Sequence, residues 1–136
     1  MSGYEILEHT ADVGLRAHAP TVTTLFEQTT RGLCDIAGIW HDGPGSSVAI
    51  DVEARDREGL MVDWLNEVLY LHDSRNVAIG SVEVDEVSEQ RARGRIAVCP
   101  LREGAETAIQ VKAVTYHQID VHETPSGWSA TVFFDI

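Results

Sequence analysis

The feature that most constrains the fold is a wide apolar face on one amphipathic segment, residues 58–72. Apolar residues recur there at helical intervals, and polar residues mark the opposite, solvent-facing side. The apolar positions are Leu60, Met61, Trp64, Leu65, Val68, Leu69 and Leu71. The polar positions are Asp63, Asn66, Glu67 and Asp73. A face this wide predicts a helix buried against a sheet, with Trp64 and Met61 in the core.

A second amphipathic helix is predicted to end at Gly38, which accepts the left-handed backbone of a helix C-terminus at little cost. Its start is marked by three possible N-caps, Thr21, Thr23 and Thr24. Thr24 also stands at the spacing of a capping box from Glu27. Both helices are therefore expected to present one apolar face each.

Alternating apolar and polar residues predict the strands. We expect them at residues 4–8, 13–19, 48–54, 77–87, 95–100, 111–123 and 128–136. Gly80 suggests a bulge within one strand, and the Thr124-Pro-Ser-Gly127 turn folds the last strand back on its predecessor. The order predicts one α+β domain over residues 1–136. We expect a two-layer sandwich whose two helices cover one face of a mixed, mostly antiparallel sheet.

Composition excludes several classes of function. The 136 residues contain no apolar run of membrane-spanning length and no signal-peptide profile, so a cytoplasmic protein is expected. A net charge of −12 argues against direct binding to a nucleic-acid backbone and favours a cation or a basic protein as partner. Cys34 and Cys99 lack the spacing of a zinc or redox motif and are expected to be reduced thiols.

The end of the chain brings two negative charges together. Asp135 and the α-carboxylate of Ile136 stand at the end of the last predicted strand, and they repel each other unless something positive lies between them. One interpretation is a strand end with both acids in water. The other is a cation site, which needs a third acid from elsewhere in the chain.

A candidate for the third acid lies near the N-terminus, where His9-Thr-Ala-Asp12 interrupts an alternating stretch. The segment is either a bulge or tight turn whose side chains cap local N–H groups, or the source of a third carboxylate, Asp12. An all-oxygen ligand set suits Ca²⁺ or Mg²⁺, with Mn²⁺ also possible, and does not favour zinc.

The only lysine, Lys112, lies in the strand predicted at residues 111–123. Strict alternation places it on one face with Val114 and Tyr116. The other face would then carry Val111, Ala113, Thr115 and His117. The aliphatic part of the Lys112 side chain either packs on apolar surface, with the ammonium in water, or places the ammonium for a charged contact. That contact would be near the acidic site or with a partner.

Common catalytic templates are absent from the chain. It contains no Gly-x-Ser-x-Gly elbow, no P-loop, no His-Glu-x-x-His and no dinucleotide fingerprint, and its six histidines lack metal-ligand spacing. If the acids do bind a cation or cap the chain ends, two further functions stay open. The same acids would also serve a metal-dependent phosphoesterase, or would simply cap the chain ends of a chaperone-like or scaffolding module.

Several separated motifs give the chain a resemblance to the archease family over nearly its whole length. They are His9-Thr-Ala-Asp-Val-Gly14, Trp64-Leu-Asn-Glu-Val-Leu-Tyr70, Val111-Lys-Ala-Val-Thr-Tyr-His117 and the terminal Asp135-Ile136. The resemblance implies an accessory protein of the RtcB-type RNA ligase, which joins RNA ends in tRNA splicing and RNA repair. Archeases promote guanylylation of the ligase's active-site histidine, so that the ligase turns over repeatedly. They are not themselves catalysts.

The resemblance also implies a metal site. Family members bind a divalent metal, typically Ca²⁺, through the Asp of the His-Thr-Ala-Asp motif and the last two residues. These correspond to Asp12, Asp135 and Ile136. The resemblance also implies that Lys112 and His9 lie on the surface through which family members act. The chain departs from many relatives at residues 102–110, which lack the histidine found in their loop. A role for that loop is therefore not carried over.

Overall fold

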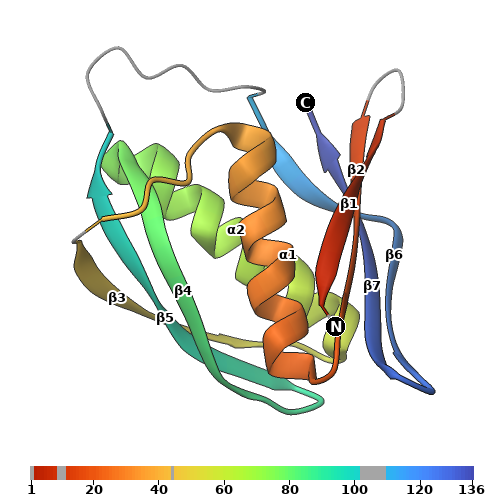
Figure 1. Ribbon diagram of the computed structural model, residues 1–136. Coiled ribbons are helices and arrows are strands. Elements are labelled where there is room, and N and C mark those ends of the chain that lie inside the picture. Colours follow the sequence, from red (N-terminus) through yellow and green to blue (C-terminus); the bar gives the residue numbers. More distant parts are fainter. Residues whose placement is uncertain (1, 9–11, 44, 102–109) are drawn as a thin grey trace.

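The computed structural model describes residues 2–8, 12–43, 45–101 and 110–136 (Figure 1). The elements are β1 (Gly3–Glu8), β2 (Asp12–Ala19), α1 (Val22–Ala37), β3 (Ser46–Glu53), α2 (Arg57–Arg75), β4 (Val77–Val87), β5 (Arg91–Pro100), β6 (Ala113–Thr124) and β7 (Gly127–Asp135). Their order is the one predicted from the sequence. Within the described ranges, no helix is long and apolar enough to cross a membrane.

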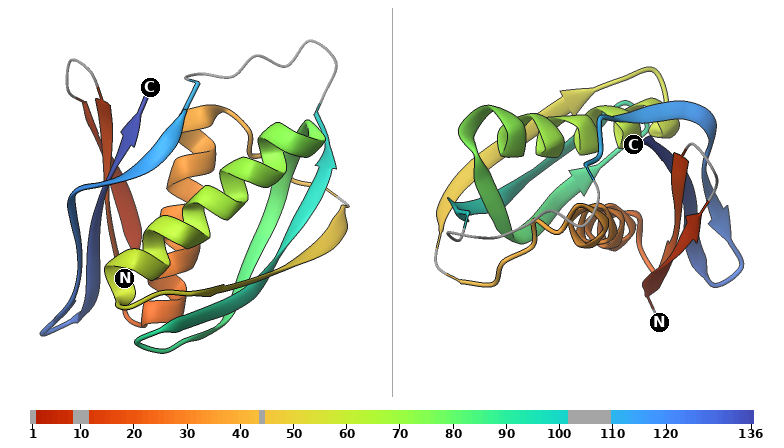
Figure 2. Two further views of the ribbon diagram at one scale, coloured as in Figure 1. Left: turned by 180° about the vertical axis from the view of Figure 1, so that it is seen from behind. Right: turned by 90° about the horizontal axis from the view of Figure 1, so that it is seen from above.

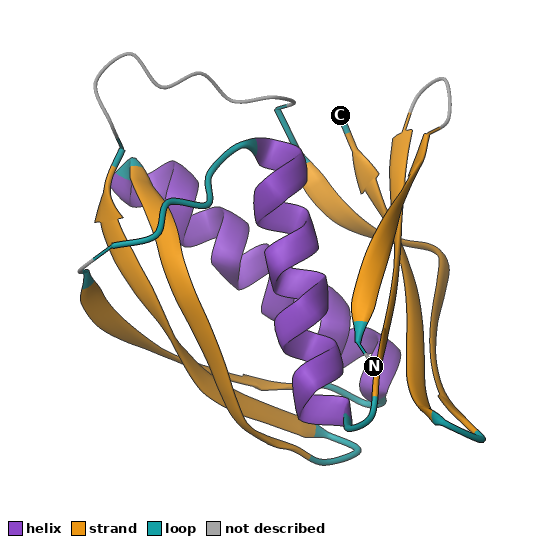
Figure 3. Ribbon diagram, in the orientation of Figure 1, coloured by secondary structure: helices purple, strands orange, loops and turns teal. Residues whose placement is uncertain are grey.

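The strands form two antiparallel sheets, so the α+β class is confirmed but the single mixed sheet is not. One sheet has the strand order β1-β2-β7-β6, and the other has the order β3-β5-β4. Both helices contact strands of both sheets and lie between them (Figure 3). Viewed from above, α1 is seen end-on in the space between the sheets (Figure 2, right). The wide apolar face of α2 therefore packs against two sheets and not one.

Trp64 of α2 joins the elements of this core. Its side chain is fully buried, and its ring meets that of Phe26 on α1 edge-on, with centroids 6.4 Å apart. The indole Nε1–H donates to Oγ1 of Thr30, at 2.9 Å, which satisfies the one polar group of the ring. On β5, a Cβ added to Gly94 would lie 2.9 Å from the Trp64 ring. Trp64 is therefore a core residue, as predicted, and so is the fully buried Met61.

Helix α2 seals the outer edge of the four-stranded sheet. Val114 of the edge strand β6 donates its N–H to Oδ1 of Asn66, at 3.0 Å, and accepts from Nδ2 of the same side chain, at 3.4 Å. Farther along β6, the N–H of Val121 donates to Glu58, at 3.0 Å. Asn66 is partly buried by this contact, so its predicted place on the solvent-facing side is wrong. These bonds satisfy edge groups that would otherwise template another strand.

Helix α1 makes the corresponding contact with the three-stranded sheet. Glu27 accepts a hydrogen bond from the N–H of Val84 on its edge strand β4, at 2.8 Å. Glu27 is thus not the partner in a capping box. The helix is capped instead by Thr21, whose side chain accepts from the N–H of Thr24, at 3.2 Å. Each sheet therefore has an edge strand bonded to a helix side chain.

Irregular pairing explains where strict alternation fails. The register of β4 shifts between Ile79 and Ser81, which confirms the bulge predicted at Gly80. In β6 the register shifts between Thr115 and Asp120, and Gln118 has a φ of +53°.

This shift corrects the face assignment predicted around Lys112. Val114 is 5 % exposed whereas Tyr116, inside the irregular stretch, is 63 % exposed, so regular alternation does not describe their environments. Val111 is buried like Val114, although strict alternation puts them on opposite faces. The alternation argument assumed regular pairing throughout, and it fails because β6 begins only at Ala113 and is interrupted after Thr115.

The two cysteines are free thiols, as expected. Cys34 is buried in α1, and Cys99 is partly buried in β5. Burial raises the pKa of the Cys34 thiol well above its ordinary value, because the thiolate would lose its hydration. Cys34 is therefore a packing residue and not a reactive nucleophile.

Candidate metal site at the strand tip

The two acids predicted from opposite ends of the chain are direct neighbours across two strands. β2 and β7 pair in antiparallel register, and the Cα of Asp12 lies opposite that of Asp135. Residues directly opposite in such a pair point to the same face, with their Cβ atoms roughly 4.5–5.5 Å apart. Figure 1 shows the C-terminus at the end of the sheet where β2 begins. We call this end of the sheet, with Asp12, Asp135 and Ile136, the tip.

The tip carboxylates point away from the core. The next pair in register, Val13 and Phe134, is buried beneath the helices, so Asp12 and Asp135 lie on the outward face. Asp12 is partly buried and Asp135 is exposed. Neither carboxylate has an ion-pair partner within the described part of the chain. Like charges directly opposite each other on neighbouring strands are destabilising.

The residues around this pair hold the end of the chain in place. The N–H of Lys112 donates to the backbone oxygen of Asp135, at 2.8 Å, and Ala113 is the register partner of Asp135 on β6. Ile136 follows directly and is 37 % exposed. The Lys112 side chain is exposed, and its ammonium has no ion-pair partner among the described residues. His9, the other predicted functional-face residue, lies outside the described residues.

A packed row crosses the sheet directly beneath the tip. Leu7, Gly14, Phe133 and Thr115 are register neighbours on four successive strands. Phe133 is 5 % exposed although it belongs to the outward face, and a Cβ on Gly14 would lie 2.7 Å from its ring. The His117 ring packs edge-on against Phe133, with centroids 6.1 Å apart. Gly14 thus makes room for an aromatic ring that supports the strand ends carrying Asp12 and Asp135.

Sequence reasoning missed this row and the Asn66 contact, although each had a signal. Gly14 interrupts a strand between two apolar residues, which indicates a close approach by another group. Phe133 and Phe134 are adjacent in a strand, so one of them must be on the outward face. Asn66 borders the apolar stripe of α2, where a polar side chain is explained by a specific hydrogen bond.

The donors at the tip suit a hard cation. The carboxylates of Asp12 and Asp135 supply oxygen only, and the α-carboxylate of Ile136 would add more. Ca²⁺ takes 6–8 oxygen ligands and accepts water among them, so a site built from few protein groups is sufficient. Within the described residues, no three side chains of His, Cys, Asp or Glu gather as metal ligands. Among the residues that the structure describes, the tip therefore holds two side-chain donors, Asp12 and Asp135.

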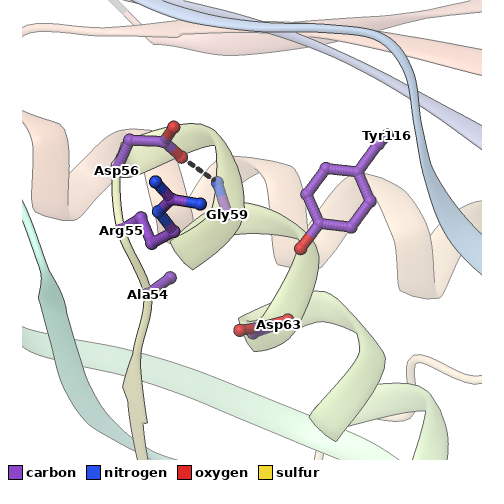
Figure 4. A pocket seen from close by; sticks show the side chains of 6 residues that line it. All are labelled: Ala54, Arg55, Asp56, Gly59, Asp63 and Tyr116. Carbon is purple, nitrogen blue, oxygen red and sulfur yellow. Dashed lines mark hydrogen bonds between the residues drawn. The ribbon is translucent and has the colours of Figure 1, made fainter.

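A second place with polar groups lies between α2 and β6 (Figure 4). It is a hollow of about 280 Å³, lined by Ala54, Arg55, Asp56, Gly59, Asp63 and Tyr116. Asp56 is already engaged there, because it accepts from the N–H of Gly59 at 2.8 Å as the N-cap of α2. The lining has no histidine, serine or cysteine to form a pair of nucleophile and base. The hollow therefore offers Asp63, Arg55 and Tyr116 as groups that can bind a ligand.

Comparison with known proteins gives one consistent result. The model of the Archease protein family (MTH1598/TM1083) matches residues 4–136. A protein archease from Methanosarcina mazei is 32 % identical, with 98 % of this chain and 95 % of the relative covered. A protein archease from Thermococcus gammatolerans is 33 % identical over the full length of both chains. The solution structure of protein 1598 from Methanobacterium thermoautotrophicum matches 98 % of this chain and 99 % of its own, with a TM-score of 0.77 and 27 % identity.

Proposed function

Because the chain belongs to the archease family, we propose that it is an accessory factor of an RtcB-type RNA ligase. It promotes guanylylation of the ligase's active-site histidine in tRNA splicing and RNA repair, in the cytoplasm. A divalent cation, Ca²⁺ first among the candidates, is held by Asp12, Asp135 and the α-carboxylate of Ile136. The observation that carries the proposal is the direct register pairing of Asp12 with Asp135 on one outward face.

The chain's own residues prepare the tip for this role. The Phe133 ring packs against Gly14 and keeps two strands in register just below the carboxylates. The hydrogen bond from Lys112 to Asp135 ties the end of β7 to β6. When bound, the cation supplies positive charge that offsets the charge of nucleotide phosphates near the ligase's histidine. The protein contributes a preset position for that charge, which lowers the entropic cost of arranging the reactants.

The tip is better suited to helping a catalyst than to being one. A metal-dependent hydrolase needs a general base or a second metal beside the first. The two aspartates that pair across β2 and β7 are both needed as ligands, so neither is free to act as the base. Phosphoester turnover by the isolated protein would overturn this part of the proposal.

The decisive experiment measures histidine guanylylation of an RtcB-type ligase with GTP, with and without this protein. Asp12→Asn and Asp135→Asn keep the size of each side chain and remove one negative charge. Each is expected to abolish most of the stimulation, because a single remaining carboxylate binds a cation weakly. One residue added after Ile136 moves the terminal carboxylate away and should have the same effect.

The matched control is Asp51→Asn, which removes an identical charge from the outward face of the other sheet. It is expected to leave stimulation unchanged. Calcium binding, measured by isothermal titration calorimetry, should be lost in the tip variants and kept in the control. Full stimulation by both Asp12→Asn and Asp135→Asn would reject the metal-tip mechanism.

A further inference from the structure

The two most exposed large apolar side chains of the described region lie on one side of the molecule. Tyr70 is 64 % exposed and Tyr116 is 63 % exposed. Tyr116 comes from β6 and lines the hollow beside Asp63 of α2 (Figure 4). Glu67 and Tyr70 follow Asp63 on α2 at spacings of four and seven residues, which places all three on one helix face. We call Asp63, Glu67, Tyr70 and Tyr116 the tyrosine face.

The polar groups of this face have no partner among the residues that the structure describes. Asp63 is partly buried at the hollow, and its carboxylate has no hydrogen-bond or ion-pair partner among the described residues. The same holds, within the described ranges, for the hydroxyls of Tyr70 and Tyr116 and the carboxylate of Glu67. A partly buried carboxylate beside an exposed ring can bind a guanidinium or an ammonium, because the ring face attracts the cation and the carboxylate neutralises it.

The segment that carries Tyr116 also contacts the end of β7 at the tip. β6 runs along α2, with Val114 bonded to Asn66, and Tyr116 follows two residues later. In the other direction, Lys112 bonds the backbone of Asp135. Strand β6 and the residues just before it therefore connect the two places, from Lys112 beside Asp135 to Tyr116 at the hollow. Exposed tyrosines are common energetic anchors at protein interfaces, where they bury much area for little conformational entropy.

We propose that the tyrosine face is the docking surface for a basic segment of the protein partner, with an arginine or lysine side chain held between Tyr116 and Asp63. The identity of that partner as the ligase rests on the proposed function, whereas the preference for a basic segment rests on the face itself. The net charge of −12 supports a basic protein surface and opposes an RNA backbone. The tip then acts on the reaction, and the tyrosine face supplies affinity.

Arg55 provides a direct test of the partner's charge. Its guanidinium lies at the hollow with Asp56 on one side (Figure 4), and within the described residues it has no ion-pair partner. A basic segment entering the hollow is repelled by Arg55, so Arg55→Ala is expected to strengthen binding. An acidic segment would be attracted by it, and binding would then weaken in the same variant.

The experiment titrates this protein into the ligase guanylylation assay and measures binding to the ligase separately by calorimetry, without GTP. Tyr116→Ala, Tyr70→Ala and Asp63→Asn are each expected to raise the dissociation constant and the half-maximal concentration by about tenfold, which is about 1.4 kcal/mol. The maximal rate at saturation should be kept. Asp12→Asn and Asp135→Asn should show the opposite pattern, with loss of the maximal rate. Circular dichroism checks that every variant is folded.

The controls distinguish the two proposals. Asp85→Asn removes one negative charge from the other sheet, so a change equal to that of Asp63→Asn would mean bulk charge only and would overturn the docking surface. If the wild-type protein gives no stimulation, the proposed function fails. The face is then tested with a fluorescent nona-arginine peptide, whose affinity should fall in Tyr116→Ala and Asp63→Asn more than in Asp85→Asn. Binding of labelled single-stranded RNA that is lost in the tyrosine variants would also overturn the proposal.

Discussion

The outward face of the three-stranded sheet and the tip of the four-stranded sheet treat their carboxylates in opposite ways, although the four-stranded sheet also has a cross-strand ion pair, Arg16 with Glu5 at 3.0 Å. On the outward face of the three-stranded sheet, each arginine of β5 meets an acid on a neighbouring strand. The pairs are Arg91 with Asp51 at 2.6 Å, Arg93 with Glu86, and Arg95 with Glu83 at 2.7 Å and Asp85 at 2.9 Å. On the four-stranded sheet, Asp12 faces Asp135, a partner of the same charge.

This difference has opposite consequences for the stability of the two regions. Opposite charges across strands support the register, by about 0.2–1 kcal/mol a pair, and like charges oppose it by similar amounts. The three-stranded sheet therefore uses its charges for its own stability. The tip carries a repulsion that the fold tolerates, because the Phe133 row and the core beneath it hold the strands together. A cation is the partner that would relieve it.

The largest effect is expected from removing the buried side chain that joins both helices to the three-stranded sheet. Trp64→Ala should lower the free energy of unfolding by about 3–5 kcal/mol, because it leaves a cavity between α1, α2 and β5. The measurement is urea denaturation together with amide hydrogen exchange. Both sheets should lose protection together. Loss confined to one sheet would show that the sheets are separate folding units.

A smaller loss is expected from opening the edge of one sheet only. Asn66→Ala removes both hydrogen bonds to Val114 and should cost about 1–3 kcal/mol, because the N–H and C=O of β6 lose their partner. Glu67→Ala, an exposed change on the next residue, is the control and should cost less than about 0.5 kcal/mol. Thermal unfolding measures both. Equal losses would show that the Asn66 bonds do not seal the edge.

Removing a charge at the tip is expected to stabilise the protein, in contrast to the two preceding substitutions. In metal-free protein, Asp135→Asn is expected to raise the free energy of unfolding by about 1 kcal/mol, since it removes like-charge repulsion. Asp51→Asn should lower it, because Arg91 loses its partner. At calcium a hundredfold above the dissociation constant, the wild type should gain about 2.7 kcal/mol and Asp135→Asn much less. Destabilisation by Asp135→Asn without calcium would contradict the comparison.

The smallest effects are expected in the pH dependence of stability, one at acid pH and one at alkaline pH. Arg91 holds the pKa of the Asp51 carboxyl below its ordinary value of 3.8. The folded state then favours the ionised acid, so this contribution is present above pH 3.8 and is lost as the pH falls through the lowered pKa. Asp51→Asn should flatten the acid side of the stability curve. An unchanged acid limb would show that the pair contributes nothing.

At the alkaline end the relevant group is Tyr4, whose hydroxyl donates to Asp35 of α1. Burial, reinforced by this hydrogen bond, raises the pKa of Tyr4 from 10.0 to about 12. The unfolded chain loses this proton first, so stability is expected to fall as the pH rises from 10 towards 12. The difference between wild type and Tyr4→Phe isolates this step from other alkaline groups. Parallel curves for the two proteins would contradict it.

Local patterns were sufficient to predict most elements and part of the site. Helix α2 was found from the spacing of its apolar residues, and the bulge at Gly80 from an interrupted alternation. The sequence also indicates both acids of the tip as candidates for one site. The failures at Asn66 and Tyr116 have a common cause, since each residue's environment is set by a segment distant in the sequence. Periodicity reports which side of an element is apolar, and it carries no information about what lies opposite.

The sequence alone therefore determined the order of elements, the buried faces of both helices and the acidic character of the chain's last residues. Only the tertiary structure decided that the strands form two sheets, that helix side chains bond their edges, and that Asp12 lies opposite Asp135. The physical reason is the sequence separation of the residues that determine each feature. Hydrophobic periodicity acts within a few residues, whereas strand register between positions 12 and 135 is chosen by the packing of the whole core.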